Sequence, residues 1–231
     1  MRKLKIISYS DEPFLNRAEA GRHLALQLEP YKGRDTLVLG IPGGGVITAE
    51  ALASELNADF DIILSRKIGA PGQPELAIGA VAEEGGIYLN REILDEVEAD
   101  ENYISEEVER QLGLIETRKN IYRSIMRMKK YESRDVIVVD DGVATGATME
   151  AALWTVRKRN PRNLIAALPV GSRKSLEKLS KSADETICLR VPELFYAVGQ
   201  FYKDFKQIDQ EEIIAILKRA ADEAEKRKGG N

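Results

Sequence analysis

The sequence contains one cysteine and one histidine among its 231 residues. A single cysteine, Cys188, cannot form an intramolecular disulfide, so a secreted disulfide framework is excluded. A cysteine-built zinc site and a multi-histidine metal cluster are excluded as well, because the chain has too few of these ligands. Cys188 and Trp154 are expected to be core residues.

The sequence also lacks a strong excess of charge of either sign. Its 34 basic and 38 acidic residues give a formal net charge of −4 at pH 7, which argues against a broad nucleic-acid-binding surface. No apolar run approaches the roughly 18 residues of a membrane-spanning helix, and the basic N-terminus has only a short apolar stretch before Asp11. We therefore expect a cytoplasmic protein that binds neither nucleic acid nor membrane.

Short apolar segments rich in Val, Ile and Leu recur along the chain. Each has the length of a strand and is apolar at both odd and even positions, which is typical of strands buried on both faces of a parallel sheet. They are TLVLGIP (36–42), FDIILS (60–65), DVIVVD (135–140), NLIAALPV (163–170) and ETICLR (185–190). Helical patterns at 46–56, 146–159 and 172–182 alternate with them. The sequence predicts an α/β fold with a doubly wound, mainly parallel sheet flanked by helices.

We expect a single domain over 1–231 with its core at about 35–190. Three amphipathic segments lie outside that core as appendages: an N-terminal helix at 16–28, a helix across 102–130, and a helix at 209–228 within the C-terminal part, 191–231. Such helices most often pack on their own domain or on a partner subunit.

The most informative segment is VIVVDDGVATGATM, residues 136–149. An apolar strand ends in two acids, and a loop of small residues then leads into a helix near Gly146. Open α/β sheets bind ligands at the carboxyl ends of their strands. Small residues let backbone N–H groups approach a ligand, and a helix N-terminus adds partial positive charge. The segment therefore predicts a phosphate-binding loop, suited to a phosphorylated, polyhydroxylated ligand such as ribose 5-phosphate.

Side chains of this segment extend the same interpretation. Thr145 and Thr148 offer hydroxyl donors, and Asp140 and Asp141 can accept from vicinal hydroxyls or hold a hydrated divalent cation. A Walker A loop is excluded because Ala147 stands where it requires lysine, and a Rossmann loop would not carry an acid pair inside its turn. An ordinary turn capped by Thr145 is the structural alternative, which a costly acid pair at a buried strand end disfavours.

The segment VVDDGVATGAT resembles the phosphoribosyl pyrophosphate (PRPP) loop of type I phosphoribosyltransferases. Further resemblance to a phosphoribosyltransferase family of unassigned base specificity covers nearly the whole chain, in FLNRAEAGRHLALQL, VLGIPGGGVITAEALASEL, RKIGAPGQPELAIGAV and PELFYAVGQFYKDFKQ. The resemblance implies a type I fold with additional helical and hood segments, Mg²⁺ as cofactor, PRPP and a nucleobase-like acceptor as substrates, and a place in nucleotide metabolism. We also expect a homodimer.

The resemblance also assigns site residues. Asp140 and Asp141 are expected to bind the ribose 2- and 3-hydroxyls. The loop that holds the 5-phosphate through backbone groups and two hydroxyls comprises Gly142, Val143, Ala144, Thr145, Gly146, Ala147 and Thr148. The pyrophosphate loop corresponds to Pro42, Gly43, Gly44 and Gly45, a segment that would otherwise be interpreted as a tight βα turn.

Gly43 departs from the family pattern, which has an arginine there to neutralise pyrophosphate. An arginine introduced at this position should tighten PRPP binding if the backbone accepts a side chain. The resemblance implies that Arg66 and Lys67 approach the diphosphate; the alternative is a solvated pair at a strand end. Residues 68–80, rich in Gly and Pro, are expected to be a mobile loop that closes over the site. Glu75 in this loop is either a charged contact or simply exposed.

Near the C-terminus, PELFYAVGQFYKDF is rich in aromatic residues. They could stack on a nucleobase, although core packing or a subunit contact is the simpler interpretation. The five residues are Phe195, Tyr196, Phe201, Tyr202 and Phe205.

The implied reaction displaces pyrophosphate from the anomeric carbon through an oxocarbenium-like state. Asp140, Asp141, Arg66 and Lys67 are the candidate catalytic residues, and catalysis would depend on positioning and electrostatics because the motifs contain no general-base histidine. Two alternatives stay open. One is a PRPP- or nucleotide-sensing regulator with the same fold, which Gly43 favours; the other is a hydrolase or phosphorylase acting on a related phosphosugar. The sequence does not identify the acceptor.

Overall fold

The computed structural model describes residues 3–97 and 99–229. Its main feature is a six-stranded, entirely parallel sheet with the strand order β1-β9-β8-β7-β2-β3. The strands are β1 (Lys3–Ser8), β2 (Thr36–Gly40), β3 (Asp59–Ile62), β7 (Asp135–Val139), β8 (Asn163–Val170) and β9 (Glu185–Arg190). The prediction of an α/β fold with a parallel sheet is confirmed.

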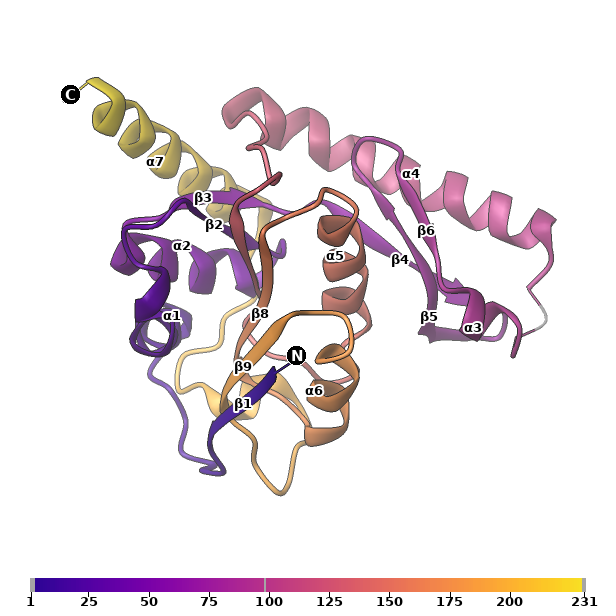
Figure 1. Cartoon of the computed structure of the whole chain (residues 1–231), viewed down its shortest axis with the longest axis horizontal. Helices are drawn as coiled ribbons and strands as arrows, with labels where there is room; N and C mark the ends of the chain where they lie inside the picture. Colours follow the sequence, from indigo (N-terminus) through magenta and orange to yellow (C-terminus); the bar gives the residue numbers. More distant parts are fainter. Residues whose placement is uncertain (1–2, 98, 230–231) are drawn as a thin grey trace.

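Helices cover both faces of this sheet (Figure 1). On one face lie α1 (Arg17–Gln27) and α2 (Gly44–Leu56), and on the other α5 (Ala147–Arg157) and α6 (Arg173–Leu179). Alternate residues of β7 enter separate cores: Ile137 packs in the cluster of α1 and α2, and Val138 in the cluster of α5 and α6. This alternation explains why the strand segments are apolar at both odd and even positions.

A second, antiparallel sheet extends the molecule on the α5 side (Figure 1). It contains β4 (Ser65–Ala70), β5 (Gln73–Ala82) and β6 (Ile87–Leu89), followed by α3 (Arg91–Leu94) and the long α4 (Glu101–Ile125). The Tyr88 ring of β6 packs on the Trp154 ring of α5 at 4.6 Å between centroids. The expectation of a loop over 68–80 was therefore wrong, since these residues form a hairpin whose two strands flank a turn at 71–72.

Other boundaries differ from the sequence-based ones. The sheet contains β1, which lies outside the expected core at 35–190, and the segment 60–65 divides between β3 and β4. The predicted helix across 102–130 ends at Ile125, five residues early. It ends there because the following chain turns back to the sheet, where the Lys129 N–H donates to the buried Asp61 carboxylate at 2.9 Å.

Arg123 anchors the C-terminal end of α4 through buried ion pairs. Its guanidinium contacts Asp61 of β3 at 2.6 Å and Glu83, next to β5, at 2.6 Å, and it donates to the Ile62 carbonyl at 3.0 Å. Asp61 is fully buried and Glu83 is 6% exposed. Burial raises the pKa of both carboxyls despite the arginine between them. These contacts join α4, the small sheet and the main sheet.

The remaining elements are two short 3₁₀ turns and the C-terminal helix α7. Two short 3₁₀ turns, Glu29–Tyr31 and Val198–Phe201, lie in connections, and α7 (Gln210–Gly229) projects from the molecule in Figure 1. Within 3–97 and 99–229, no helix is long and apolar enough to cross a membrane.

Candidate active site

The two loops singled out in the sequence meet at the carboxyl edge of the main sheet. Pro42–Gly45 follows β2, Asp140 follows β7, and these two strands are hydrogen-bonded neighbours. The contact is close, because a Cβ built on Gly44 would overlap the carboxylate of Asp141 and the guanidinium of Arg17. A side chain at this position would therefore have to displace the ion pair of Asp141 and Arg17. The two motifs therefore form one site.

The acid pair is asymmetric. The Asp141 carboxylate forms an ion pair with Arg17 at 2.7 Å, while its backbone N–H donates to the Asp140 carboxylate at 2.9 Å. Burial and the charge of Asp141 raise the pKa of Asp140 well above its usual range. Asp140 is thus shifted towards its neutral form, whereas Asp141 faces a cation.

Arg17, the first residue of α1, is the component of this site that the sequence analysis missed. Its side chain is 8% exposed. Besides the contact with Asp141, it donates to the Lys206 carbonyl at 2.9 Å and lies 4.0 Å over the Phe205 ring. It shares a helix face with Ala20 and Leu24, both fully buried. In the sequence, the one indication of a role for Arg17 was its charge on the same apolar helix face as Ala20 and Leu24.

The loop after the acid pair matches its expected role in part. Val143 was wrongly included among the donors, because its N–H bonds the Val170 carbonyl at 3.0 Å and the residue is 3% exposed. Gly142 is also buried, packed beside Val198 and Val170. Ala144, Thr145 and Thr148 are exposed, and α5 begins at Ala147 after Gly146. The exposed part of the loop and the first turn of α5 remain available to an anion.

Gly43 explains the missing arginine. Its backbone has φ of 121° and ψ of −142°, a conformation that L residues rarely adopt. The backbone at Gly43 therefore does not readily accept a side chain. An arginine introduced there would strain the loop, so we no longer expect it to tighten PRPP binding. Any additional positive charge has to come from other elements.

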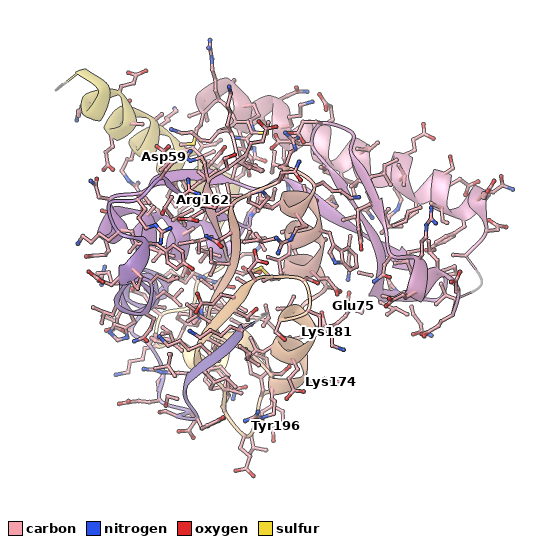
Figure 2. The ribbon with its side chains drawn as sticks, in the orientation of Figure 1. Asp59, Glu75, Arg162, Lys174, Lys181 and Tyr196 are labelled. Atoms are coloured by element: carbon pink, nitrogen blue, oxygen red, sulfur yellow. The ribbon has the colours of Figure 1, made fainter. Side chains whose placement is uncertain are left out.

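The hairpin of β4 and β5 supplies positive charge beside this loop. Lys67 pairs with Glu75 at 2.7 Å, and Glu75 reaches the Thr145 hydroxyl at 3.5 Å. Glu75 is thus a charged contact, although its side chain is 69% exposed; Figure 2 labels it beside α5. Arg66 points towards α4 and donates through Nε to the Gln111 side chain at 2.5 Å.

A cavity of about 420 Å³ lies beside the two loops, under the β4–β5 hairpin. Its lining combines Pro42 and Thr148 from the two loops with Arg66 and Lys67 from β4, and α4 forms another wall. The volume lies in the range of roughly 300–1,000 Å³ typical of small-molecule sites. The cavity therefore brings together Pro42, Thr148 and the basic pair of β4, whereas Asp140 and Asp141 are not among its lining residues.

Comparison with known proteins identifies this arrangement. The family model described as phosphoribosyl transferase domain matches residues 14–206. The chain belongs to the phosphoribosyl transferase family. The resemblance noted in the sequence is thus confirmed at the level of the family.

Named relatives agree with this assignment. Two Mycobacterium tuberculosis proteins, from strains CDC 1551 and H37Rv, carry provisional phosphoribosyl transferase names and are each 37% identical over 207 residues, 90% of this chain. The chain spans about half the length of these curated relatives, 47%. The crystal structure of the protein TT1426 from Thermus thermophilus is 42% identical, with a TM-score of 0.84, and the match covers 90% of this chain and 98% of that one.

The C-terminal aromatic cluster divides between the core and the surface. Phe201 and Tyr202 are buried, and Phe195 stacks on Phe201 at 5.4 Å. The Tyr202 hydroxyl donates to the Asp141 carbonyl at 2.6 Å, a contact that the sequence did not indicate. Tyr196 is 80% exposed and lies at the lower edge of Figure 2. Core packing thus accounts for Phe201 and Tyr202.

The metal chemistry of the site is limited to the acid pair. Among the described residues, no group of three or more His, Cys, Asp or Glu side chains could hold a metal ion. Asp140 and Asp141 offer the hard oxygen donors that Mg²⁺ prefers, and this ion commonly completes its shell with substrate oxygens and water. The residues present therefore fit Mg²⁺ bound together with a phosphorylated sugar.

Proposed function

We propose that the protein transfers phosphoribose from PRPP to a nucleobase-like acceptor, with Mg²⁺ as cofactor and pyrophosphate as leaving group. The main support is the contact between the glycine loop, Pro42–Gly45, and the acid pair, where Gly44 packs against Asp141. This contact holds a diphosphate-type loop next to the carboxylates expected to bind the ribose. We further propose that the protein acts in nucleotide metabolism as a cytoplasmic homodimer. Size-exclusion chromatography with light scattering tests the dimer.

Each loop has a separate role in this proposal. Asp140 and Asp141 accept hydrogen bonds from the ribose hydroxyls, and the exposed residues of 144–148 bind the 5-phosphate through N–H and hydroxyl donors. The amides of Pro42–Gly45 other than the proline face the diphosphate, with Arg66 and Lys67 beside it. Val143 has no part in phosphate binding, because its N–H is already bonded.

Catalysis in this site depends on positioning. The bond from the anomeric carbon to the pyrophosphate oxygen breaks, positive charge develops on the sugar, and negative charge develops on the leaving group. Fixed amides and cations around the diphosphate stabilise that negative charge, and the acid pair fixes the ribose ring. When bound, Mg²⁺ supplies further neutralisation of the diphosphate.

The test is to incubate the protein with PRPP, Mg²⁺ and a panel of nucleobases while pyrophosphate release is followed. Release that depends on one acceptor supports the transferase. Release without any acceptor indicates a hydrolase acting on the phosphosugar. PRPP binding without release indicates a regulator that uses the same fold. Absence of both binding and release contradicts the proposal.

A further inference from the structure

The loop after β7 offers its backbone to a ligand, so the direction of each of its peptide groups matters. N–H groups attract an anion, whereas a carbonyl oxygen directed at it would repel it. Three carbonyls of this loop are bonded within the protein. The Val143 carbonyl accepts from the Ser172 N–H at 3.3 Å, and the Gly146 carbonyl accepts from the Glu150 N–H at 2.8 Å. The third, that of Ala144, is bonded by side chains.

Two serines at the start of α6 hold the Ala144 carbonyl. The Ser175 hydroxyl donates to it at 2.5 Å, and the Ser172 hydroxyl lies 3.2 Å from the same oxygen. The two hydroxyl oxygens are 2.9 Å apart, so Ser172 donates its one proton either to this carbonyl or to Ser175. Because Ser175 is only 5% exposed, its hydroxyl is satisfied by the protein rather than by bulk water.

The peptide group between Ala144 and Thr145 links this carbonyl to a donor. In a planar trans peptide, the C=O and the following N–H point in opposite directions. Since the Ala144 carbonyl is directed at α6, the Thr145 N–H is directed away from it. Within 3–97 and 99–229 this N–H has no hydrogen-bond partner, and Thr145 is exposed. It is thus available to an anion, and rotation of this one peptide group would replace the donor with an acceptor.

Further contacts keep the loop against the start of α6. The Val143 N–H donates to the Val170 carbonyl at 3.0 Å, as part of a parallel bridge between Val143 and Gly171. A Cβ built on Gly171 would lie 2.7 Å from the Val143 side chain, and Gly146 lies beside the buried Leu179 of α6. The separation between the loop and α6 is therefore fixed, so the serine hydroxyls stay within reach of the carbonyl.

We propose that Ser172 and Ser175 are positioning residues for the phosphate loop: by holding the Ala144 carbonyl, they direct the Thr145 N–H towards the 5-phosphate. The inference rests on the proposed function for the identity of this phosphate. The serines act through the loop, because a donor that is oriented before binding does not have to be ordered by the anion. Their effect is expected at the 5-phosphate and not at a diphosphate bound by Pro42–Gly45.

The test compares ribose 5-phosphate, PRPP and inorganic pyrophosphate by titration calorimetry, with Mg²⁺ present and at one fixed salt concentration. Ser175→Ala removes the donor and keeps a residue that favours the helix. It should weaken ribose 5-phosphate and PRPP by about ten-fold or more, the scale of one hydrogen bond to a charged group. Pyrophosphate should bind as in the parent protein, because it does not use this loop.

Three further variants separate positioning from helix stability. Ser172→Thr keeps both the hydroxyl and the helix cap, so it should retain the affinity. Ser172→Gly removes the hydroxyl at a position where helices tolerate glycine, and it tests the inference if Ser175→Ala does not fold. Ser180→Ala is the matched control, because this hydroxyl donates to the Glu177 carbonyl at 2.8 Å, at the other end of α6. Melting temperatures establish that each variant is folded.

A second measurement observes the donor directly. In ¹H–¹⁵N NMR spectra, the Thr145 amide signal of the parent protein should move when ribose 5-phosphate is added, because its N–H bonds the phosphate. In Ser175→Ala the same addition should move it much less. A Thr145 signal that does not respond in the ligand-saturated parent protein contradicts the inference.

The calorimetric outcomes separate this inference from the function on which it rests. Unchanged ribose 5-phosphate affinity in folded Ser175→Ala and Ser172→Gly variants overturns it, as does an equal loss for pyrophosphate or in Ser180→Ala. If ribose 5-phosphate binds in a Ser175-dependent manner but PRPP yields no pyrophosphate with any nucleobase, the positioning role stands and the transferase proposal fails. If pyrophosphate is released with one acceptor, and Ser175→Ala binds both sugars like the parent protein, the reverse holds. If the parent protein binds neither sugar, both fail.

Discussion

Replacing Arg123 by methionine should test how α4 is held to the rest of the protein. The substitution keeps most of the apolar stem but leaves the carboxylates of Asp61 and Glu83 buried without their cation. Removing one partner of a buried ion pair typically costs about 3–5 kcal/mol. Against a total stability of roughly 5–15 kcal/mol, this loss would be large.

The loss should also depend on pH. Burial already raises the pKa of Asp61 and Glu83 in the folded protein, and removing the arginine raises both further. A carboxyl whose folded-state pKa is raised destabilises the fold when it is ionised, above its unfolded pKa, and this cost disappears as the folded protein takes up a proton. The difference between Arg123→Met and the parent protein should therefore be greatest near pH 8 and smaller near pH 5.

Guanidinium unfolding at both pH values is the measurement. Far-UV circular dichroism reports on the whole fold. The fluorescence of Trp154, the only tryptophan, reports on the contact with Tyr88 of the small sheet. Arg127→Met, at an exposed position, should change stability by no more than about 0.5 kcal/mol. A loss below about 1 kcal/mol in Arg123→Met, or an equal loss at both pH values, would refute the reasoning.

Three further substitutions or measurements address the site. Asp141→Asn should weaken PRPP binding by about 1.5–3 kcal/mol in calorimetry, and it should lower the melting temperature because Arg17 loses its carboxylate; unchanged affinity would remove Asp141 from the ribose site. Gly43→Arg should lose about 1–3 kcal/mol of stability through its backbone conformation without tighter PRPP binding, whereas a clear gain in affinity would contradict that conformation. In hydrogen exchange, the paired amides of β4 and β5 should be protected without ligand, and PRPP should slow exchange mainly at 71–75; rapid exchange along both strands would restore the mobile-loop interpretation.

Local patterns were sufficient for the strands that form the centre of the sheet. The segments at 135–140 and 163–170 are apolar on both faces because the side chains of β7 and β8 enter two cores. The acid pair after β7 could be recognised in the sequence because two acids directly follow an apolar strand. The loops after β2 and β7 could be placed at one sheet edge from the parallel fold alone.

Features that depend on contacts between distant segments could not be predicted from local sequence patterns. The β4–β5 hairpin was interpreted as a loop because Gly69, Gly72 and Pro74 are common in loops, yet the antiparallel pairing tolerates them at its bulge and turn. Arg17 contacts Asp141 only because α1 packs at the carboxyl edge of the sheet. The conformation of Gly43 likewise appears only in the backbone, so the sequence showed the missing arginine but not its cause.

The position of β1 has a consequence for how the chain folds during synthesis. This edge strand, Lys3–Ser8, pairs only with β9, Glu185–Arg190. At roughly 5–20 residues per second, a ribosome needs on the order of 10–40 s to extend the chain from one strand to the other. During this time β1 has no partner strand, and Lys3 and Lys5 within it oppose pairing with other chains. β1 is thus synthesised long before β9 and can join the sheet only after β9 has been made.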